Sequence, residues 1–153
     1  MLNDIIEDSN FAKIMQKNIE NLIIYLFERD QPFGILCKLD DTRFDPELPD
    51  YIRSEFRQMT LFFLAGYTFE SANLIDDELV FEAGFGADNF GSVVSVPLYS
   101  IMQIIVDETP LLINLANYKP KKRLIKQASP SGVENSMASF LSNPENSKFL
   151  KKQ

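Results

Sequence analysis

The stretch Leu79-Val80-Phe81-Glu82-Ala83-Gly84-Phe85, followed by Ser92-Val93-Val94-Ser95-Val96, decides the class of fold. Both segments are short, rich in Val and Phe, and bounded by Asp, Asn and Gly, which is the pattern of β-strands separated by turns. Upstream, residues 59–65 and 67–74 have a similar composition, and Asp76-Asp77-Glu78 stands before Leu79 as a hairpin turn would. These runs predict a protein built mainly of antiparallel strands.

The segments around this stretch add further elements. The glycine-rich residues 83–91 predict a flexible loop, residues 35–39 a short strand, and the apolar run 111–115 an edge strand. Pro97 is expected to start a helical turn, because its missing N–H costs nothing there. Apolar residues at helical spacing continue that turn through residue 106.

The N-terminal region has the periodicity of a helix. Apolar side chains recur at three- and four-residue steps from Phe11 to Leu26 and define one apolar face. Ser9 or Asn10 is expected to cap its start, and the proline and glycine of residues 31–34 end it. Because further apolar residues widen the stripe, the helix either simply covers a sheet or also uses a second face to form a homodimer.

Together these elements predict an α+β, mainly β fold. We expect a small antiparallel barrel or sandwich of five or six short strands, with a helix before it and a short helix after the last main strand. Residues 1–118 would form this single domain. From Lys119 onward Ser, Asn, Pro, Lys and Gln dominate, so residues 119–153 are expected to be a flexible basic tail.

Composition and charge exclude several classes of function. The 153-residue chain has no histidine and one cysteine, Cys37, which excludes Ser-His-Asp catalysis, ordinary zinc sites and an internal disulfide. Residues 1–118 contain 20 acidic and 7 basic side chains, a balance of −13, whereas residues 119–153 carry +6. An acidic body does not attract phosphates, so we expect no nucleic acid binding by the body.

The sequence also carries expectations about location. The N-terminus opens with Met1-Leu2-Asn3-Asp4 and lacks the basic region of a signal peptide. No apolar run has the roughly 20 residues that a membrane span needs. We therefore expect a cytoplasmic protein without membrane contact.

The candidate catalytic groups are pairs of acidic residues. Asp40-Asp41, Asp76-Asp77 and Asp107-Glu108 all fall where turns are predicted, and carboxylates are common there for capping and solubility. The segment Asp76-Asp77-Glu78 lacks the spacing of an EF-hand, and the glycines of residues 84–91 form neither GxGxxG nor a phosphate-binding loop. The sequence therefore predicts a protein with no catalytic residues, no metal and no cofactor.

A binding surface remains as the source of function. Glycines beside strands let another backbone approach closely, and an open sheet edge accepts an extended peptide as an added strand. The segments Leu64-Ala65-Gly66-Tyr67 and Phe85-Gly86-Ala87 combine small and aromatic residues in this way. They predict an apolar peptide-binding groove at a sheet edge.

Two blocks of the sequence have counterparts in a known family. One block is residues 79–87 followed by Val94-Ser95-Val96-Pro97-Leu98, and the other is Leu48-Pro49-Asp50-Tyr51-Ile52-Arg53 leading to Met59-Thr60-Leu61. The former resembles the strand, Phe-Gly-Gly loop and Ser-Val-Pro strand of the SspB (stringent starvation protein B) family of protease adaptors. The latter is similar to the branch of that family found in α-proteobacteria. The resemblance covers roughly residues 10–118.

The resemblance implies a fold related to Sm-like barrels and a set of partners. The N-terminal helix would form a homodimer through Phe11, Met15, Leu22 and Leu26. The body would bind the degradation tag that the ssrA tmRNA system adds to stalled nascent proteins, and would bring tagged substrates to the ClpXP protease without chemistry of its own. The expected tag-binding residues are Leu64, Ala65, Gly66, Tyr67, Phe85, Gly86 and Ala87.

The resemblance also implies that the tail docks on the N-terminal zinc-binding domain of the ClpX unfoldase. Two segments have a suitable composition, Pro120-Lys121-Lys122-Arg123-Leu124-Ile125-Lys126 and the terminal run that contains Lys148, Phe149, Leu150, Lys151 and Lys152. We favour the terminal run, because the roughly 31 residues that separate Tyr118 from Phe149 then act as a tether.

Two other functions fit the same sequence. An Sm-like RNA-binding module would use its basic tail to contact phosphate, and its binding would fall steeply with salt. A domain of the same kind would also be suited to some other C-terminal peptide. Tag binding by a body without its tail separates the adaptor from the RNA-binding module.

Overall fold

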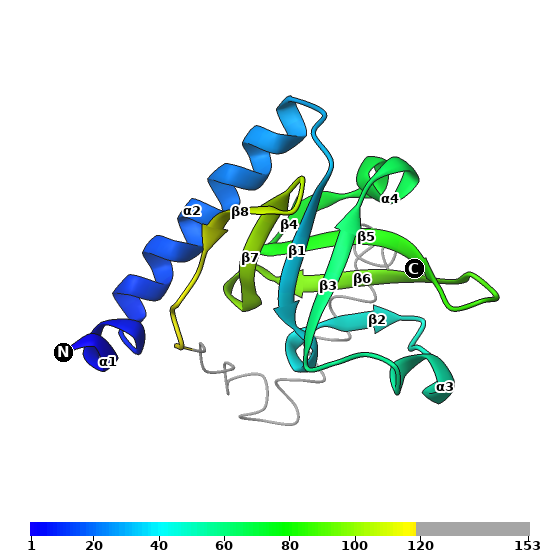
Figure 1. The fold of residues 1–153 in the computed structure, drawn as a ribbon, viewed down its shortest axis with the longest axis horizontal. Coiled ribbons are helices and arrows are strands. Elements are labelled where there is room, and N and C mark those ends of the chain that lie inside the picture. Colours follow the sequence, from blue (N-terminus) through cyan, green and yellow to red (C-terminus); the bar gives the residue numbers. More distant parts are fainter. Residues whose placement is uncertain (119–153) are drawn as a thin grey trace, which may run out of the picture. The chain divides into compact units, whose positions relative to one another are not determined.

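Two antiparallel four-stranded sheets pack as a sandwich, with a long helix beside them (Figure 1). The computed structural model describes residues 1–118. The first sheet consists of β1 (Phe33–Lys38), β3 (Met59–Leu64), β7 (Ile101–Val106) and β8 (Thr109–Ile113), and the second of β2 (Arg43–Asp45), β4 (Asn73–Ile75), β5 (Glu78–Phe85) and β6 (Phe90–Pro97). The strand orders are β3-β1-β7-β8 and β2-β6-β5-β4, so within these residues no strand is shared and no closed barrel forms.

The helices are mostly short. They are α1 (Leu2–Ile6), α2 (Ser9–Glu28), α3 (Asp50–Arg53) and α4 (Gly66–Ser71), with two 3-10 turns, η1 (Leu39–Asp41) and η2 (Leu98–Ser100). None of the helices in the described part of the chain is long and apolar enough to cross a bilayer. The predicted α+β class is confirmed, and of the two predicted architectures the sandwich is the one observed.

Helix α2 follows the predicted periodicity, but its cap is Asp8 rather than Ser9 or Asn10. The Asp8 carboxylate accepts a hydrogen bond from the backbone N–H of Phe11 at 3.0 Å. A carboxylate is favoured at this place because the first N–H groups of a helix lack partners and the helix dipole is positive there. The buried face of the helix consists of Ala12, Ile19, Ile23 and Leu26.

The core lies between the two sheets. Strand β3 alternates between exposed and buried side chains, so Phe62 and Leu64 point inward while Leu61 and Phe63 point outward. The ring of Phe62 contacts the ring of Phe81, which belongs to the other sheet. The two rings pack edge to face, with 5.6 Å between their centroids. The largest fully buried side chains from the strands are Phe33, Phe81, Ile35, Leu64, Leu79, Ile101, Ile104 and Val94.

Residues 101–106 form strand β7, so the predicted continuation of a helix through residue 106 is wrong. Pro97 does precede a helical turn, but this turn, η2, ends at Ser100. The run Ile101-Met102-Gln103-Ile104-Ile105-Val106 is apolar at nearly every position, and therefore satisfies helical and strand spacing alike. Pairing with β1 on one side and β8 on the other decides in favour of the strand.

Residues 67–74, predicted as a strand, instead form α4 and the short strand β4. Gly66, the first residue of α4, adopts a φ of +59° one residue after Ala65 has left β3, which ends the extended chain at a place where glycine is favoured. The helix then directs the ring of Phe69 against Phe27 and Phe33, with centroid distances of 5.8 and 6.2 Å. These contacts outweigh the strand propensity of the segment.

The predicted flexible loop over residues 83–91 is also mostly strand. Ala83 pairs with Ser92, Gly84 with Gly91 and Phe85 with Phe90, so that only residues 86–89 form the turn. Pairing across the hairpin overrides the local signal of the glycines.

Acidic residues close two of the hairpins. Asp76 and Asp77 connect β4 to β5, and Asp107 and Glu108 connect β7 to β8; all four have φ between 48° and 68°. Two successive residues with positive φ give the turn whose twist matches antiparallel strands. The predicted turn before Leu79 and the predicted edge strand near the end of the domain are both confirmed.

Candidate functional site

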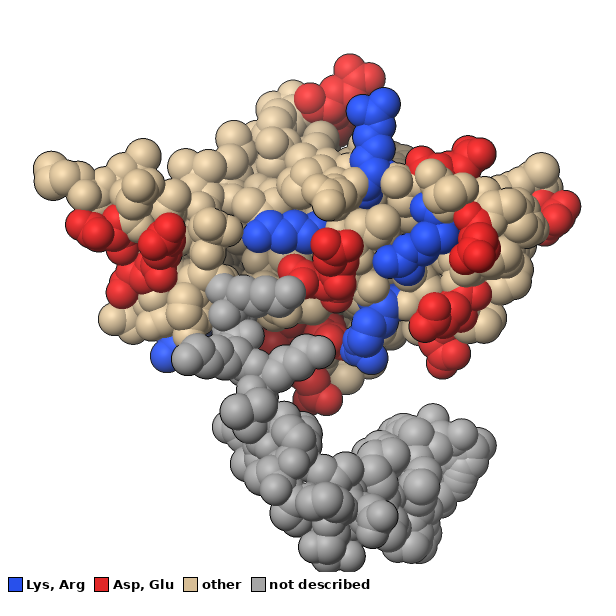
Figure 2. All heavy atoms as spheres, turned by 90° about the horizontal axis from the view of Figure 1, so that it is seen from below, with Lys and Arg blue, Asp and Glu red and all other residues tan. Residues whose placement is uncertain are grey.

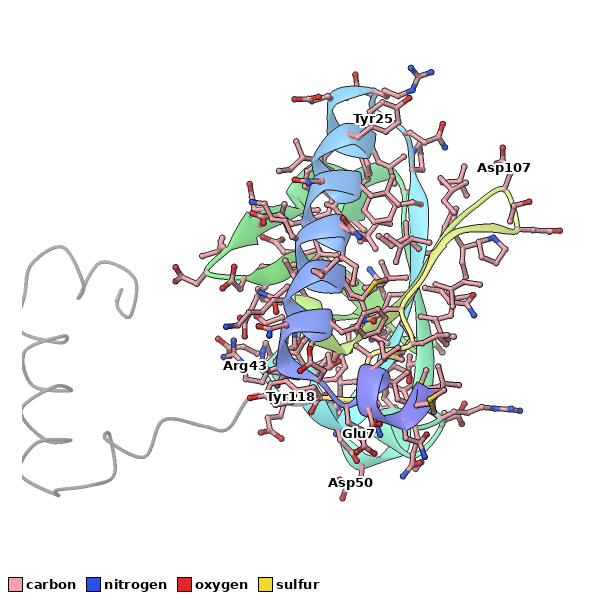
Figure 3. The ribbon with its side chains drawn as sticks, turned by 90° about the vertical axis from the view of Figure 1, so that its left-hand side faces the viewer. Glu7, Tyr25, Arg43, Asp50, Asp107 and Tyr118 are labelled. Atoms are coloured by element: carbon pink, nitrogen blue, oxygen red, sulfur yellow. The ribbon has the colours of Figure 1, made fainter. Side chains whose placement is uncertain are left out.

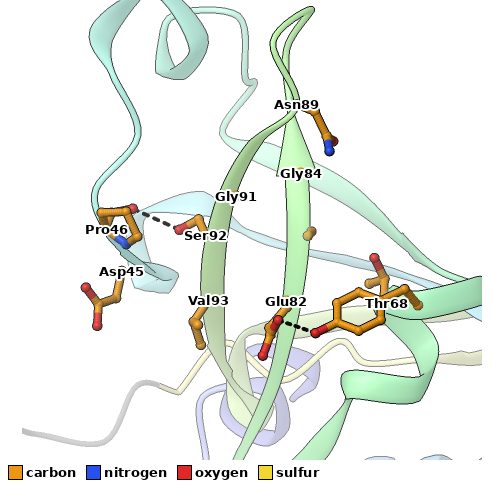
Figure 4. A pocket seen from close by; sticks show the side chains of 11 residues that line it. Asp45, Pro46, Thr68, Glu82, Gly84, Asn89, Gly91, Ser92 and Val93 are labelled. Atoms are coloured by element: carbon orange, nitrogen blue, oxygen red, sulfur yellow. Dashed lines mark hydrogen bonds between the residues drawn. The ribbon is translucent and has the colours of Figure 1, made fainter. Parts of the chain in front are cut away.

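A groove of about 430 Å³ crosses the second sheet between α4, the end of β2 and the β5–β6 hairpin (Figure 4). Tyr67 and Thr68 line one side from α4, and Asp45 and Pro46 line the other side at the end of β2. Glu82, Gly84, Gly91 and Val93 lie between them on β5 and β6. The groove is therefore built on strands that pairing holds in place.

Two glycines of the β5–β6 hairpin lie in the floor of the groove, and the side chain of Asn89 covers one of them. Gly84 and Gly91 are directly opposite each other in the β5–β6 register. A methyl group built on Gly91 would meet no atom within 4 Å, whereas one on Gly84 would clash with the side-chain amide of Asn89. The space above Gly91 is thus open, and a bound chain can approach the sheet closely there.

Hydrogen bonds fix the two walls. The Tyr67 hydroxyl donates to Glu82 Oε1 at 2.6 Å, and the backbone N–H of Glu82 donates to Ser71 Oγ at 2.9 Å, so α4 is tied to β5. On the other side, the Ser92 hydroxyl donates to the Pro46 carbonyl at 2.8 Å (Figure 4). The hydrogen bond to Glu82 and the charge of its carboxylate raise the pKa of Tyr67.

The sheet under the groove is supported by aromatic packing. The ring of Phe85 lies 5.7 to 6.2 Å from the rings of Phe44, Phe56 and Phe62, in edge-on arrangements. Such contacts hold the hairpin in one position relative to the rest of the sandwich.

Of the seven predicted tag-binding residues, Tyr67 lines this groove. Gly66 precedes it and is exposed, and Phe85 contributes its ring to the core instead. Leu64 is fully buried opposite Phe33, and Ala65 lines a different groove on the first sheet. The predicted set is therefore not brought together in one place.

Gly86 and Ala87 belong to a smaller hollow of about 300 Å³ near α3. It is also lined by Tyr51, whose hydroxyl donates to Asp88 Oδ2 at 3.2 Å. Partial desolvation, followed by this hydrogen bond and the Asp88 charge, raises the pKa of Tyr51. This hollow and the larger groove share the β5–β6 hairpin.

Sequence reasoning missed most of the groove. Glu82, Gly84, Gly91 and Val93 are within segments that the sequence identifies as strand or loop, but their common face follows only from the register. Placing the turn at residues 86–89 is the step that sets Gly84 opposite Gly91. Asp45 and Pro46 come from a distant segment and carry no local signal of a site.

The residues expected at a dimer interface lie on α2 in two environments. Leu26 is buried in the core of its own chain, whereas Phe11, Met15 and Leu22 are half-buried. The exposed apolar side chains of the helix are Ile14, Ile24 and Tyr25, and Tyr25 lies near the C-terminal end of α2 (Figure 3). The expected ClpX-docking residues Lys148, Phe149, Leu150, Lys151 and Lys152 lie outside the described residues.

Potential metal ligands do not gather in one place on the described residues. No group of three or more potential metal ligands occurs among residues 1–118. The acidic pairs 76–77 and 107–108 lie at hairpin turns, where positive φ explains their presence. On the face drawn in Figure 2, acidic and basic side chains are intermingled rather than separated into a basic stripe.

Comparison with the models of known protein families and with curated proteins gives no match to this chain. Function is therefore proposed from the groove and from the resemblance in the sequence.

Proposed function

We propose that this protein is a non-enzymatic adaptor that binds ssrA-tagged proteins in the groove on the second sheet and tethers them to the ClpX unfoldase. The observation that carries the proposal is the open space above Gly91, in a groove bordered by the aromatic ring of Tyr67. The SspB-like sequence blocks supply the identity of the tag. Such an adaptor works in the cytoplasm and, by the same resemblance, as a homodimer.

The lining of the groove suits an extended peptide. The open space above Gly91 lets the backbone of a peptide approach the sheet, and side chains at alternate positions then reach the walls. Asp45 and Glu82 offer carboxylate oxygens to amide donors of the peptide, and no Lys or Arg is among the described residues that line the groove. Affinity for the tag therefore rests on amide groups and apolar contacts rather than on pairing with acidic tag residues.

The residues of the groove support binding rather than chemistry. The chain has no histidine to act as a base at neutral pH. The hydroxyls of Ser92 and Tyr67 are engaged as donors to Pro46 and Glu82. Delivery by an adaptor needs no reactive group, because holding the substrate near the protease raises its effective concentration.

Fluorescence anisotropy of a labelled ssrA-tag peptide, titrated with the full chain, tests the proposal. Tyr67→Ala is expected to weaken binding about tenfold or more, since aromatic residues often dominate peptide interfaces. Tyr25→Ala is the matched control: this tyrosine is also exposed but lies on α2 outside the groove. Equal affinity of both variants for the tag would contradict the assignment of the groove.

A parallel titration with single-stranded RNA addresses the other class of function. Absence of tag binding together with salt-sensitive RNA binding would replace the adaptor with an RNA-binding module. Saturable tag binding with little dependence on salt supports the adaptor.

A further inference from the structure

The outer face of the first sheet carries another groove, of about 590 Å³, whose floor is apolar. Leu61 and Phe63 of β3 point outward, and 58% and 65% of their surfaces are exposed. Both side chains lie beside Gly34 of β1, because a methyl group built on this glycine would be 3.4 Å from Leu61 Cδ1 and 3.6 Å from Phe63 Cδ1. On the other side of Gly34, Ile105 of β7 completes the floor.

One end of this groove is acidic. Asp107 and Glu108 form the turn between β7 and β8 and line the groove, and Asp107 lies at the tip of that hairpin, which projects from the sheet (Figure 3). The described residues that line the groove include no Lys or Arg. Both acidic residues are exposed, and no described Lys or Arg forms an ion pair with either carboxylate. Their charges are therefore available to a partner.

We infer that this groove binds a segment of another protein in which large apolar side chains are followed by Lys or Arg. An exposed apolar patch with a polar rim is typical of an interaction surface. The two carboxylates at the rim select positive charge in the partner, because complementary charges steer association and exclude wrong partners. The balance of −13 over residues 1–118 attracts a basic segment in the same way.

The same charges disfavour two other occupants of the groove. Asp107 and Glu108 repel anionic lipid headgroups, which would otherwise suit an apolar surface. A second copy of this chain would bring the same acidic turn to the contact, because a two-fold interface uses one surface of each copy. Like charges brought together in this way oppose association.

The strand order sets the spacing of the two features in the partner. Strand β1 lies between β3 and β7, so about 10 Å separates the side chains of β3 from β7, where the acidic turn begins. An extended segment covers that distance in about three residues. We expect an apolar side chain of the partner over Leu61 and Phe63, and its positive charge about three residues further along, beside Asp107 and Glu108.

This groove is separate from the proposed tag-binding groove. It lies on the first sheet, and the two grooves have no described lining residue in common. The inference therefore does not rest on tag binding, and either proposal can fail while the other stands.

Fluorescence anisotropy of a labelled peptide, Phe-Leu-Ser-Ser-Lys-Lys, titrated with the full chain, tests the inference. Saturable binding that weakens with added salt is expected, because part of the attraction is between exposed charges. The same peptide with glutamates in place of its lysines should bind about tenfold more weakly or not at all. No binding of the lysine peptide, or equal binding of the two peptides, would overturn the inference.

Two variants of the protein locate the bound peptide. Phe63→Ala is expected to weaken binding about tenfold or more, since an exposed aromatic ring in an apolar groove is the type of residue that dominates interfaces. Asp107→Asn with Glu108→Gln should weaken it about fivefold, because exposed ion pairs contribute less. Wild-type affinity in either variant would show that the peptide does not occupy this groove as inferred.

Matched controls lie on the second sheet. Ile75→Ala removes an exposed apolar side chain, and Asp76→Asn with Asp77→Asn neutralises the turn between β4 and β5; both should leave the affinity for the lysine peptide unchanged. Circular dichroism checks that each variant is folded. If Tyr67→Ala weakens binding of this peptide and Phe63→Ala does not, the peptide occupies the groove on the second sheet, and the inference is overturned.

Sedimentation equilibrium tests a second copy as the occupant. A wild-type chain that does not bind the lysine peptide, and that sediments as a dimer which Phe63→Ala dissociates, would assign the groove to a second copy of this chain. That result would overturn the inference of a basic, apolar partner segment.

Discussion

Gly91 determines how closely a bound chain can approach the second sheet, because the space above it is open. At position 91 a larger side chain meets open space, so Gly91→Val is expected to leave the fold intact. Its stability should stay equal or rise by about 1 kcal/mol, because glycine is unfavourable within strands. Tag affinity should fall about tenfold or more, since the side chain fills the floor. Urea unfolding and anisotropy give the two quantities, and a Gly91→Val protein that binds the tag like wild type would contradict the site.

Cys37 is another residue whose surroundings lead to a measurable effect. Burial, opposed by the hydrogen bond with Thr42 and reinforced by the charge of Asp41, raises the pKa of the Cys37 thiol to about 12. Above about pH 9 the unfolded chain loses a proton that the folded chain keeps, so the free energy of unfolding falls as pH rises. The expected loss from this group approaches about 1.4 kcal/mol per pH unit.

Urea unfolding at pH 8 and pH 10 checks this effect. Wild type should lose more stability between the two pH values than Cys37→Ala, which lacks the titrating group. Other groups titrate in both proteins and cancel in the difference. An identical pH dependence of the two proteins would show that the thiol ionises normally in the fold.

At the scale of elements, helix α2 separates side chains of the core from those on its surface. Leu26→Ala should lower the free energy of unfolding by about 2–5 kcal/mol, because Leu26 is buried within its own chain. Ile14→Arg, at an exposed position, should leave stability within about 0.5 kcal/mol and shift the proposed homodimer toward monomer. Sedimentation equilibrium measures the shift. A dimer that survives Ile14→Arg unchanged would place the interface elsewhere.

The local sequence was sufficient to predict those helices and strands whose spacing of apolar residues fits only one type of element. The spacing from Phe11 to Leu26 fits a helix, and the runs in β3 and β5 fit strands. Residues 101–106 were ambiguous because an apolar run without polar interruptions suits either element, and only pairing with β1 resolves it. In α4, contacts of Phe69 with residues far along the chain outweighed the local strand propensity.

The candidate site was harder to predict than the fold for a related reason. Leu61 and Leu64 are the same type of residue and lie three residues apart, yet Leu64 is in the core and Leu61 faces outward. The strand phase that separates them depends on pairing with β1. The groove likewise depends on the register that brings Gly84 opposite Gly91, and on Pro46, which lies far away in the sequence.

For the whole molecule, the proposal predicts a division of labour between the body and its C-terminal end. A chain that ends at Ser147 should bind the tag with unchanged affinity, because the groove lies within residues 1–118. It should no longer accelerate degradation of an ssrA-tagged protein by ClpXP, since the proposed docking residues are missing. Anisotropy and a degradation assay measure the two properties side by side. Loss of tag binding in the shortened chain would contradict this division.

Strand β3 has a consequence for how the protein behaves when concentrated or heated. It is an edge strand, and its six residues, Met59-Thr60-Leu61-Phe62-Phe63-Leu64, carry no charge and no proline. The edges of the second sheet, β2 and β4, are only three residues long each. An uncharged, aromatic edge of this length is a template for strand addition between molecules and a starting point for amyloid-like aggregation. Among the described strands, β3 is therefore the one best suited to such addition, and a partner that covers Leu61 and Phe63 would also shield this strand.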